Sequence, residues 1–271
     1  MDIFLAIILG VIEGATEFLP ISSTAHLVVS EKLLGFKDEA SLFTVVVQLG
    51  AILAAAWYFR KDLANIFKKL VSGDKPTKRF VVNVFLGLLP AGLIGLIVEK
   101  LWGIPDSLIV IAISLIVGGV IIWIVENHLH TQLPKTDSID YAQITPKRSL
   151  TVGFAQALAI IPGVSRSGAT IVSGMLSGLD RKTATVFSFY LSIPIMLAAS
   201  ALKLKDDHTK IHLITGGNIG VIVGTTVAFV SAFMAVKWLL RYVQTHNLKP
   251  FAYYRIVLGL VILCLLIGKV L

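Results

Sequence analysis

The first thirty residues hold a dense group of polar side chains in an otherwise apolar stretch. The run Glu13-Gly-Ala-Thr-Glu17-Phe-Leu-Pro-Ile-Ser22-Ser23-Thr24-Ala-His26 offers two carboxylates, three adjacent hydroxyls and an imidazole. Glu13 and Glu17 are four residues apart, so on a helix they share one face at a distance of about 6 Å. Like charges at that distance repel, and burial adds to the cost. The pair therefore predicts a divalent cation, Mg²⁺ or Ca²⁺, or alternatively proton uptake.

A second polar group lies in the middle of the chain, in the run Pro162-Gly-Val-Ser-Arg166-Ser-Gly-Ala-Thr170. The guanidinium of Arg166 is a planar fork of donors, which suits bidentate recognition of a phosphate. Gly163 and Gly168 would let backbone N–H groups approach such a ligand, at the positive end of the helix that follows. The alternative is an internal ion pair between Arg166 and one of the two glutamates.

Composition indicates whether these polar groups belong to a water-soluble protein or to a membrane protein. Of 271 residues, 56% are hydrophobic and 15% are charged, and the mean hydropathy is +0.85. Long apolar windows of this kind predict a polytopic all-α membrane protein. The single cysteine, Cys264, rules out an intramolecular disulfide and a cysteine metal site. Six spans are expected, at about 40–59, 80–98, 107–125, 183–202, 211–236 and 251–271.

The two polar groups interrupt apolar segments that are too short on either side to span a bilayer comfortably. Residues 3–34 and 149–179 therefore fit re-entrant helix–loop–helix hairpins better than kinked spans, with the irregular backbone lining a cavity. The two segments also resemble each other at an offset of 143 residues. Gly10-Val-Ile-Glu13 with Ile21-Ser-Ser-Thr matches Gly153-Phe-Ala-Gln156 with Val164-Ser-Arg-Ser.

The chain thus divides into a first repeat at 1–125, a polar connector at 126–148 and a second repeat at 149–271. Each repeat holds one hairpin and three spans, so the second enters the membrane with inverted topology, and the two broken segments should meet near the midplane. Loops expected on one side carry 14 Lys and Arg residues and those on the other carry 7. This bias places the first side in the cytoplasm, and it accounts for the basic net charge without a nucleic-acid partner.

The nucleophile has three candidates on residue chemistry alone. His26 follows Ser23 by three residues, close enough to act as its base if the chain turns at Thr24-Ala25. Direct attack by His26, or attack by a metal-bound water with Ser23 only holding phosphate, stays open.

Together, the runs Glu13–His26 and Pro162–Thr170 strongly resemble the two motifs of the undecaprenyl-diphosphate phosphatase family, the bacitracin-resistance membrane proteins. The resemblance extends over the full length and includes the segments around Gln48 and Pro250–Arg255. It implies hydrolysis of a C55 polyprenyl diphosphate to the monophosphate carrier and inorganic phosphate, in the bacterial cytoplasmic membrane.

The resemblance also implies roles for particular residues. Glu17, Ser23, His26 and Arg166 map on the catalytic positions, and Glu13 with Glu17 on the metal position. A homodimer is compatible with this interpretation, and a lipid-phosphate or anion transporter on the same inverted-repeat plan is the alternative function. The expected phosphate-binding and substrate-binding residues are Ser22, Thr24, Gln48, Gly163, Ser165, Ser167, Gly168 and Thr170.

Overall fold

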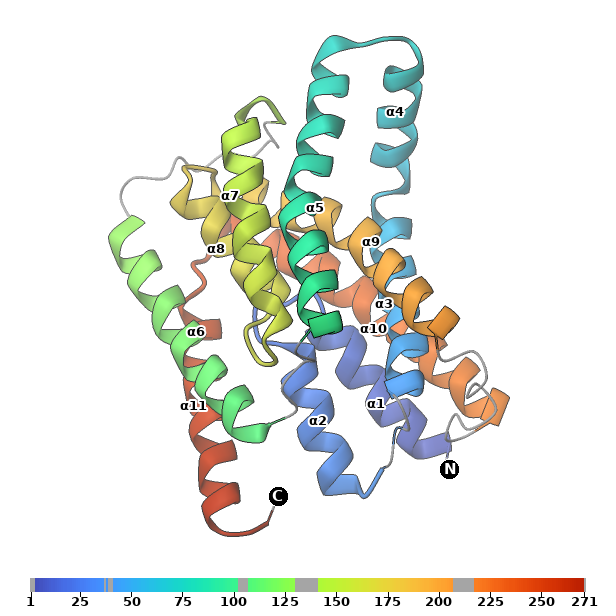
Figure 1. Cartoon of the computed structure of the whole chain (residues 1–271), viewed down its shortest axis with the longest axis vertical. Coiled ribbons are helices and arrows are strands. Elements are labelled where there is room, and N and C mark those ends of the chain that lie inside the picture. Colours follow the sequence, from blue (N-terminus) through green and yellow to red (C-terminus); the bar gives the residue numbers. More distant parts are fainter. Residues whose placement is uncertain are drawn as a thin grey trace.

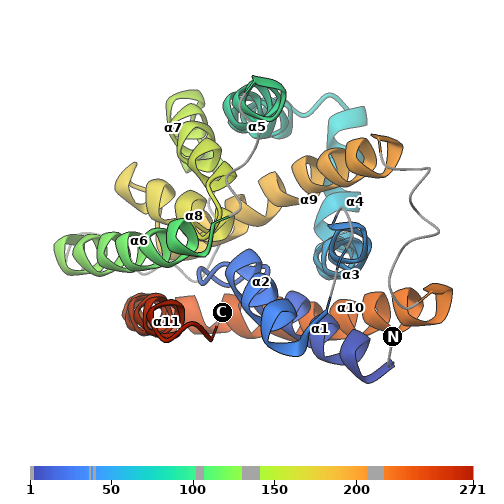
Figure 2. The same cartoon turned by 60° about the horizontal axis from the view of Figure 1, so that its bottom comes forward.

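The computed structural model describes residues 3–36, 38, 41–101, 107–129, 141–206 and 217–270. Every regular element in these residues is helical (Figure 1), as the composition predicts. Long helices stand around a centre where two shorter helix pairs meet, and Figure 2 shows the same bundle tilted toward one end.

Two helix pairs enter the bundle from opposite ends (Figure 1). Helices α1 (Ile3–Thr16) and α2 (Ser23–Leu34) come from the end that carries both termini. Helix α7 (Pro146–Ala157), the short η3 (Leu158–Ile160) and α8 (Arg166–Leu176) come from the other end. A helix of 14 residues is about 21 Å long and a bilayer core is about 30 Å thick, so neither member of a pair spans it alone. This arrangement is compatible with re-entrant hairpins and with an inverted repeat.

Within the described residues, five helices are long and apolar enough to cross a membrane, and α3 and α4, bent by 65° at Phe59, together pass the same test. The chain is therefore a multi-pass membrane protein. The segment 60–79, which lies between two of the expected spans, is largely helical. The remaining helices are α3 (Leu42–Tyr58), α4 (Arg60–Val71), α5 (Lys75–Leu101), α6 (Leu108–Leu129), α9 (Arg181–Asp206), α10 (Gly217–Thr245) and α11 (Lys249–Ile267), with η2 (Tyr141–Gln143) before α7.

Observed helix bounds differ from the expected spans mainly at the ends. The span expected at 211–236 is helical from Gly217 and runs on to Thr245, and the start of the expected segment lies outside the described residues. Helix α5 extends beyond 80–98 in both directions. At its N-terminus, Asp74 caps the added turns by accepting a hydrogen bond from the Thr77 amide at 2.9 Å.

Each hairpin packs on a long helix of the other repeat: α1 on α10, and α7 on α5. Gly10 and Gly153, which are 143 residues apart, make equivalent contacts. A Cβ atom on Gly10 would lie 2.5 Å from the carbonyl oxygen of Gly224, and one on Gly153 would lie 2.5 Å from that of Gly87. Any larger side chain would push the helices apart, so glycine permits both close approaches.

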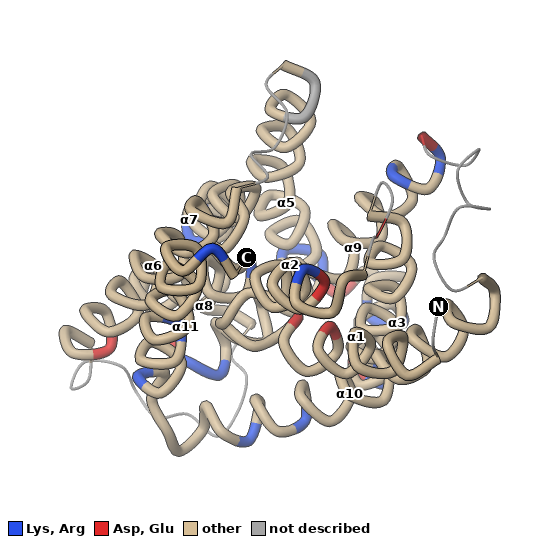
Figure 3. The backbone as a smooth tube through the Cα atoms, turned by 90° about the horizontal axis from the view of Figure 1, so that it is seen from below, with Lys and Arg blue, Asp and Glu red and all other residues tan. Residues whose placement is uncertain are grey.

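The charged residues are distributed as a membrane protein requires. Seen from below, most of the tube is neutral, and acidic positions lie beside α1 and α2 near the middle (Figure 3). Glu13 and Glu17 are both buried, 1% and 8% exposed. Buried carboxylates are costly unless a protein partner, a bound ligand or a proton compensates them.

The structure generates a test of orientation, because the start of α5 and the end of α9 lie at opposite ends of the bundle (Figure 1). We expect Lys75→Cys, in a Cys264→Ala background, to react with a membrane-impermeant maleimide from the cytoplasmic side, and Lys205→Cys to react from outside. Cys264→Ala alone is the control, since the native thiol is exposed. Labelling of both positions from one side would contradict the inverted arrangement, and the reverse pattern would invert the orientation.

Candidate active site

Two irregular loops meet in the centre of the bundle, one between α1 and α2 and one between η3 and α8. Ser22 and Ser165, 143 residues apart, cap the helices that follow them, and both have positive φ angles, 71° and 69°. Ser22 Oγ accepts a hydrogen bond from the Ala25 amide, and Ser165 Oγ accepts one from the Gly168 amide at 3.1 Å. Serine rarely adopts positive φ, so both loops hold strained backbone, which is common at functional sites.

The two loops point the positive ends of α2 and α8 at the same place. The first backbone N–H groups of a helix have no intrahelical acceptor, and the helix dipole adds positive charge there. Ser167 Oγ, in the first turn of α8, donates to the carbonyl of Leu19 in the first loop at 2.8 Å. This bond ties the loops together, so two helix N-termini converge where an anion could bind.

One carboxylate joins the two halves chemically. Ser23 Oγ donates a short hydrogen bond to Glu17 Oε2, and Arg166 Nη2 donates to Glu17 Oε1 at 3.0 Å. The Arg166 guanidinium also lies over the ring of Phe18, 5.9 Å from its centroid. The internal ion pair left open by the sequence therefore forms, with Glu17. It also positions the Ser23 hydroxyl beside a base that can accept its proton.

Two buried groups beside this pair have no hydrogen-bond partner. They are the carboxylate of Glu13, with both oxygens unpaired, and Arg166 Nη1. Unpaired buried polar atoms are rare, and at functional sites they often interact with a bound water, ion or ligand. Of the two glutamates, only Glu13 has carboxylate oxygens without a partner, because both oxygens of Glu17 accept hydrogen bonds from Ser23 and Arg166. A divalent cation held by the pair would take its remaining ligands from water or substrate. Within the described residues no group of three His, Cys, Asp or Glu side chains could hold a metal.

His26 lies elsewhere than the sequence suggested. Because Ser23–Leu34 is a continuous helix, the chain makes no turn at Thr24-Ala25. His26 Nδ1 lies 2.7 Å from the Ser22 carbonyl oxygen, and Nε2 lies 2.6 Å from the Tyr254 hydroxyl. The imidazole also stacks on the Tyr254 ring. Both ring nitrogens are thus engaged away from Ser23, and the expected contact between Ser23 and His26 is absent.

A cavity of about 270 Å³ opens beside the Glu17–Arg166 pair. Its walls come from both loops, from the first half of α3 and from the second half of α9. Of the residues predicted from sequence, eight line it: Glu17, Ser22, Ser23, Thr24, Gln48, Gly163, Ser165 and Arg166.

The other five predicted residues lie outside that lining: Glu13 and His26, described above, and three residues of α8 that support the second loop. The Gly168 amide donates a hydrogen bond to Ser165 Oγ, and Ser167 Oγ donates one to the Leu19 carbonyl oxygen. Thr170 Oγ1 lies 2.6 Å from the Ser188 hydroxyl on α9, which joins α8 to α9. These residues therefore fix the shape of the second loop.

Sequence reasoning missed Gln156, which lines the cavity with both amide atoms buried and unpaired. It is 3% exposed and occupies the position of Glu13 in the second repeat. The repeat offset was the signal that could have identified it. An amide offers a donor and an acceptor without charge, so the Gln156 side chain can donate a hydrogen bond to a phosphate oxygen from the α7 side of the cavity.

Sequence reasoning also missed the role of Arg255 on α11, which is 1% exposed. Gly118 makes room for its guanidinium, since a Cβ atom there would lie 2.1 Å from Arg255 Nη2. Within the described residues no carboxylate lies within ion-pair distance of this cation. Instead it donates to five carbonyl oxygens in both loops and α6, those of Pro20, Ser114, Leu115, Gly163 and Val164.

The sequence matches known proteins over nearly its full length. Residues 6–261 match the family model described as bacitracin resistance protein BacA. A protein of Methylobacillus flagellatus named undecaprenyl-diphosphatase is 47% identical, over 97% of this chain and 98% of its own. Undecaprenyl-diphosphatase 3 of Acinetobacter baylyi is 45% identical over 97% of both chains. A protein of Acinetobacter baumannii named undecaprenyl-diphosphatase is 46% identical over 97% of this chain and 95% of its own.

The contacts of Arg255 predict a large effect on stability. Arg255→Met removes every donor and leaves several buried carbonyl groups unpaired, at about 1–3 kcal/mol each before relaxation. We expect the apparent melting temperature in detergent to fall by about 6–12 °C. Arg241→Met, an exposed arginine on α10, is the matched control and should shift it by less than about 2 °C. Equal shifts in the two variants would show that Arg255 does not hold the loops.

Proposed function

This chain belongs to the bacitracin resistance protein BacA family, and from that premise we propose that it hydrolyses undecaprenyl diphosphate to undecaprenyl phosphate and inorganic phosphate. The observation that carries the proposal is the contact between Ser23, Glu17 and Arg166, which joins a hydroxyl, a base and a phosphate-binding cation. Release of the monophosphate returns a lipid carrier to cell-wall synthesis, and consumption of the diphosphate accounts for bacitracin resistance.

The cavity fits the head of such a substrate. A volume of about 270 Å³ accommodates a diphosphate but not a C55 chain. Ile195, Met196 and Ala199 of α9 form an apolar part of the wall, and Leu197 and Leu202 on the same helix are exposed. A polyprenyl chain can leave the cavity along this helix and remain in the hydrocarbon.

We assign nucleophilic attack to Ser23, with Glu17 as its base. Glu17 accepts the hydroxyl proton while Ser23 Oγ bonds to the terminal phosphorus, and the bond from that phosphorus to the bridging oxygen breaks. Polyprenyl monophosphate leaves with that oxygen. Water then attacks the phosphoserine, releases inorganic phosphate and restores the hydroxyl. We assign binding of the negative oxygens, as charge develops on them, to Arg166 Nη1 and to the amides at the starts of α2 and α8. The lack of a protein partner for Arg166 Nη1 supports this assignment.

His26 then acts as a positioning residue. Its hydrogen bonds to the Ser22 carbonyl and the Tyr254 hydroxyl connect the first turn of α2 to α11. They orient the helix whose first residue is the nucleophile. The proposal therefore separates His26, which holds the loop, from Ser23, which reacts.

We further propose that Glu13 and Glu17 hold Mg²⁺ or Ca²⁺ during turnover. The unpaired carboxylate of Glu13 supports this assignment, because a buried carboxylate without a partner is unfavourable. A bound divalent cation supplies positive charge to the phosphate oxygens. Cellular placement in the bacterial cytoplasmic membrane, and action as a homodimer without nucleic acid, complete the proposal.

A transporter of lipid phosphates is the rival function, because paired hairpins in an inverted repeat are also a transporter plan. A carrier needs no hydroxyl held against a carboxylate, and Ser23 and Glu17 favour an enzyme. In detergent there are no membrane-bounded compartments, so phosphate release by the solubilised protein reports hydrolysis and not transport. We expect it to release inorganic phosphate from undecaprenyl diphosphate catalytically, and absence of release with intact lipid binding would favour transport.

Arg166→Lys tests the guanidinium fork. A lysine keeps the charge but cannot bind Glu17 and a phosphate oxygen with two separate nitrogens. We expect turnover to fall at least about 100-fold, measured as phosphate release in detergent. Lys75→Ala, an exposed change at the start of α5, should leave turnover within about twofold. Near-normal turnover in Arg166→Lys would exclude the fork.

Ser23→Ala tests the nucleophile. We expect turnover to fall by about 10³-fold or more. Acid quenching of the native enzyme with substrate labelled in the terminal phosphate should place the label on Ser23, as read by mass spectrometry. Label on His26 would assign attack to the imidazole, and absence of label with full turnover would assign it to water.

Glu13→Gln tests the cation. The substitution removes the unpaired charge while keeping the shape, so we expect weaker activation by Mg²⁺ or Ca²⁺. Activity of the native enzyme should vanish in excess chelator and return when either cation is added. Full activity in chelator would contradict the metal assignment and leave Glu13 to bind a proton.

A further inference from the structure

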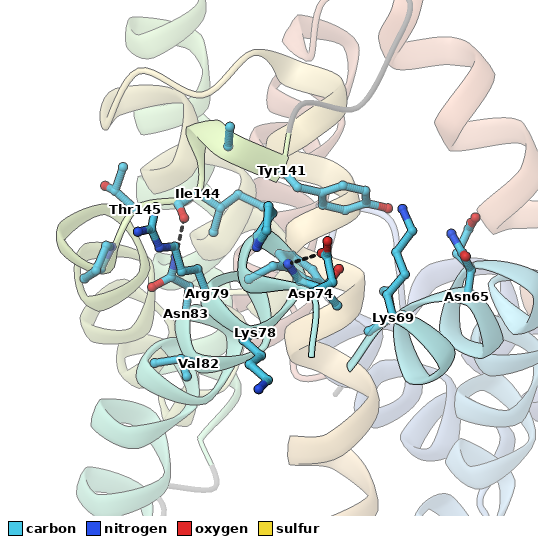
Figure 4. Close-up of a pocket in the computed structure, with 17 residues that line it drawn as sticks. Asn65, Lys69, Asp74, Lys78, Arg79, Val82, Asn83, Tyr141, Ile144 and Thr145 are labelled. Carbon is cyan, nitrogen blue, oxygen red and sulfur yellow. Dashed lines mark hydrogen bonds between the residues drawn. The ribbon is translucent and has the colours of Figure 1, made fainter. Parts of the chain in front are cut away.

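A second cavity, of about 950 Å³, shares no lining residue with the active site. It lies where α4, the turn before α5, the start of α5 and the segment from η2 to α7 come together (Figure 4). Figure 1 shows this region at the end of the bundle opposite the two termini. The proposed chemistry uses none of these residues.

The charged lining of this cavity comprises three basic and two acidic side chains. The basic side chains are Lys69, Lys78 and Arg79, and the amides of Asn65 and Asn83 also line the cavity. Among the described residues, no acidic side chain lies within ion-pair distance of these three cations. Charges that protein carboxylates leave unpaired are available to an anionic ligand.

Two carboxylates also line the cavity, and one of them is already engaged. Asp74 accepts a hydrogen bond from the Thr77 amide at 2.9 Å and caps α5. Hydrogen bonds from Thr77 lower the pKa of Asp74, which stays ionised in this role. Asp62 is the other carboxylate. The cavity therefore keeps a net positive charge.

An apolar surface continues from the cavity along α5. Val82 lines the cavity, and Phe85, Leu89 and Leu93 follow it at helical spacing on the same face. All four are more than half exposed. Since α5 is one of the candidate membrane spans, this stripe faces hydrocarbon. A ligand with its head in the cavity can lay an acyl chain on the stripe.

We propose that this cavity binds the phosphate headgroup of an anionic phospholipid from the surrounding leaflet. Lys78 and Arg79 bind the phosphate, Lys69 adds charge, and the chains follow α5 from Val82. The basic cavity explains the preference for an anion, and the adjacent stripe explains the preference for an amphiphile over a free anion.

Native mass spectrometry of the full chain, purified in micelles with phosphatidylglycerol or phosphatidylcholine, tests the site. We expect phosphatidylglycerol to be retained in preference, and the variant Lys78→Ala/Arg79→Ala to retain it at least fivefold less. Lys61→Ala/Lys68→Ala is the matched control, since it removes two exposed charges of α4 that do not line the cavity. Equal retention of the two lipids, or equal loss in the two variants, would overturn the proposal.

Two competition measurements identify the molecule that carries the bound phosphate group. At equal mole fraction we expect phosphatidylglycerol to outcompete a polyprenyl monophosphate, and inorganic phosphate not to displace it. Preferential retention of the polyprenyl monophosphate, or displacement by inorganic phosphate alone, would overturn the phospholipid assignment. Phosphate release in detergent reports folding of each variant, and Arg79→Gln replaces the double variant if that one is inactive.

Discussion

A single buried cation sets the position of both loops that form the active site. Arg255 donates to the Pro20 carbonyl in the first loop and to the Gly163 and Val164 carbonyls in the second. Loops without regular structure leave carbonyl groups unpaired, which is unfavourable inside a membrane protein. The guanidinium satisfies several of them at once, and its own burial is compensated by those bonds. The irregular backbone needed for anion binding can therefore exist at this depth.

The two loops share a framework and differ in chemistry. Ser22 and Ser165 cap equivalent helices with nearly the same φ angle. The next residue is Ser23 in the first loop and Arg166 in the second, so in the proposed reaction one supplies the nucleophile and the other the cation. The same contrast separates Glu13 from Gln156. The two equivalent loops therefore differ in the groups that they present, and the proposed reaction needs a contribution from each.

The sequence predicted the all-helical membrane fold and the site residues that cluster around Glu17, because polar residues within apolar segments are conspicuous. It did not predict the partner of Ser23, since the choice between Glu17 and His26 depends on where α2 begins. The sequence did not predict the role of Arg255, because its acceptors lie up to 235 residues away in the chain. The side-chain types in a sequence do not reveal which backbone carbonyl groups will accept hydrogen bonds from a buried arginine. The metal and the catalytic roles remain predictions.

The central claim is that both loops together bind the diphosphate. Hydrogen–deuterium exchange of the purified protein, with and without a methylene-bridged polyprenyl diphosphonate that cannot be hydrolysed at the bridge, tests this directly. The account predicts slower amide exchange in residues 19–26 and in residues 161–169 at the same ligand concentration. Protection of only one loop, or of neither at a concentration that inhibits turnover, would contradict it.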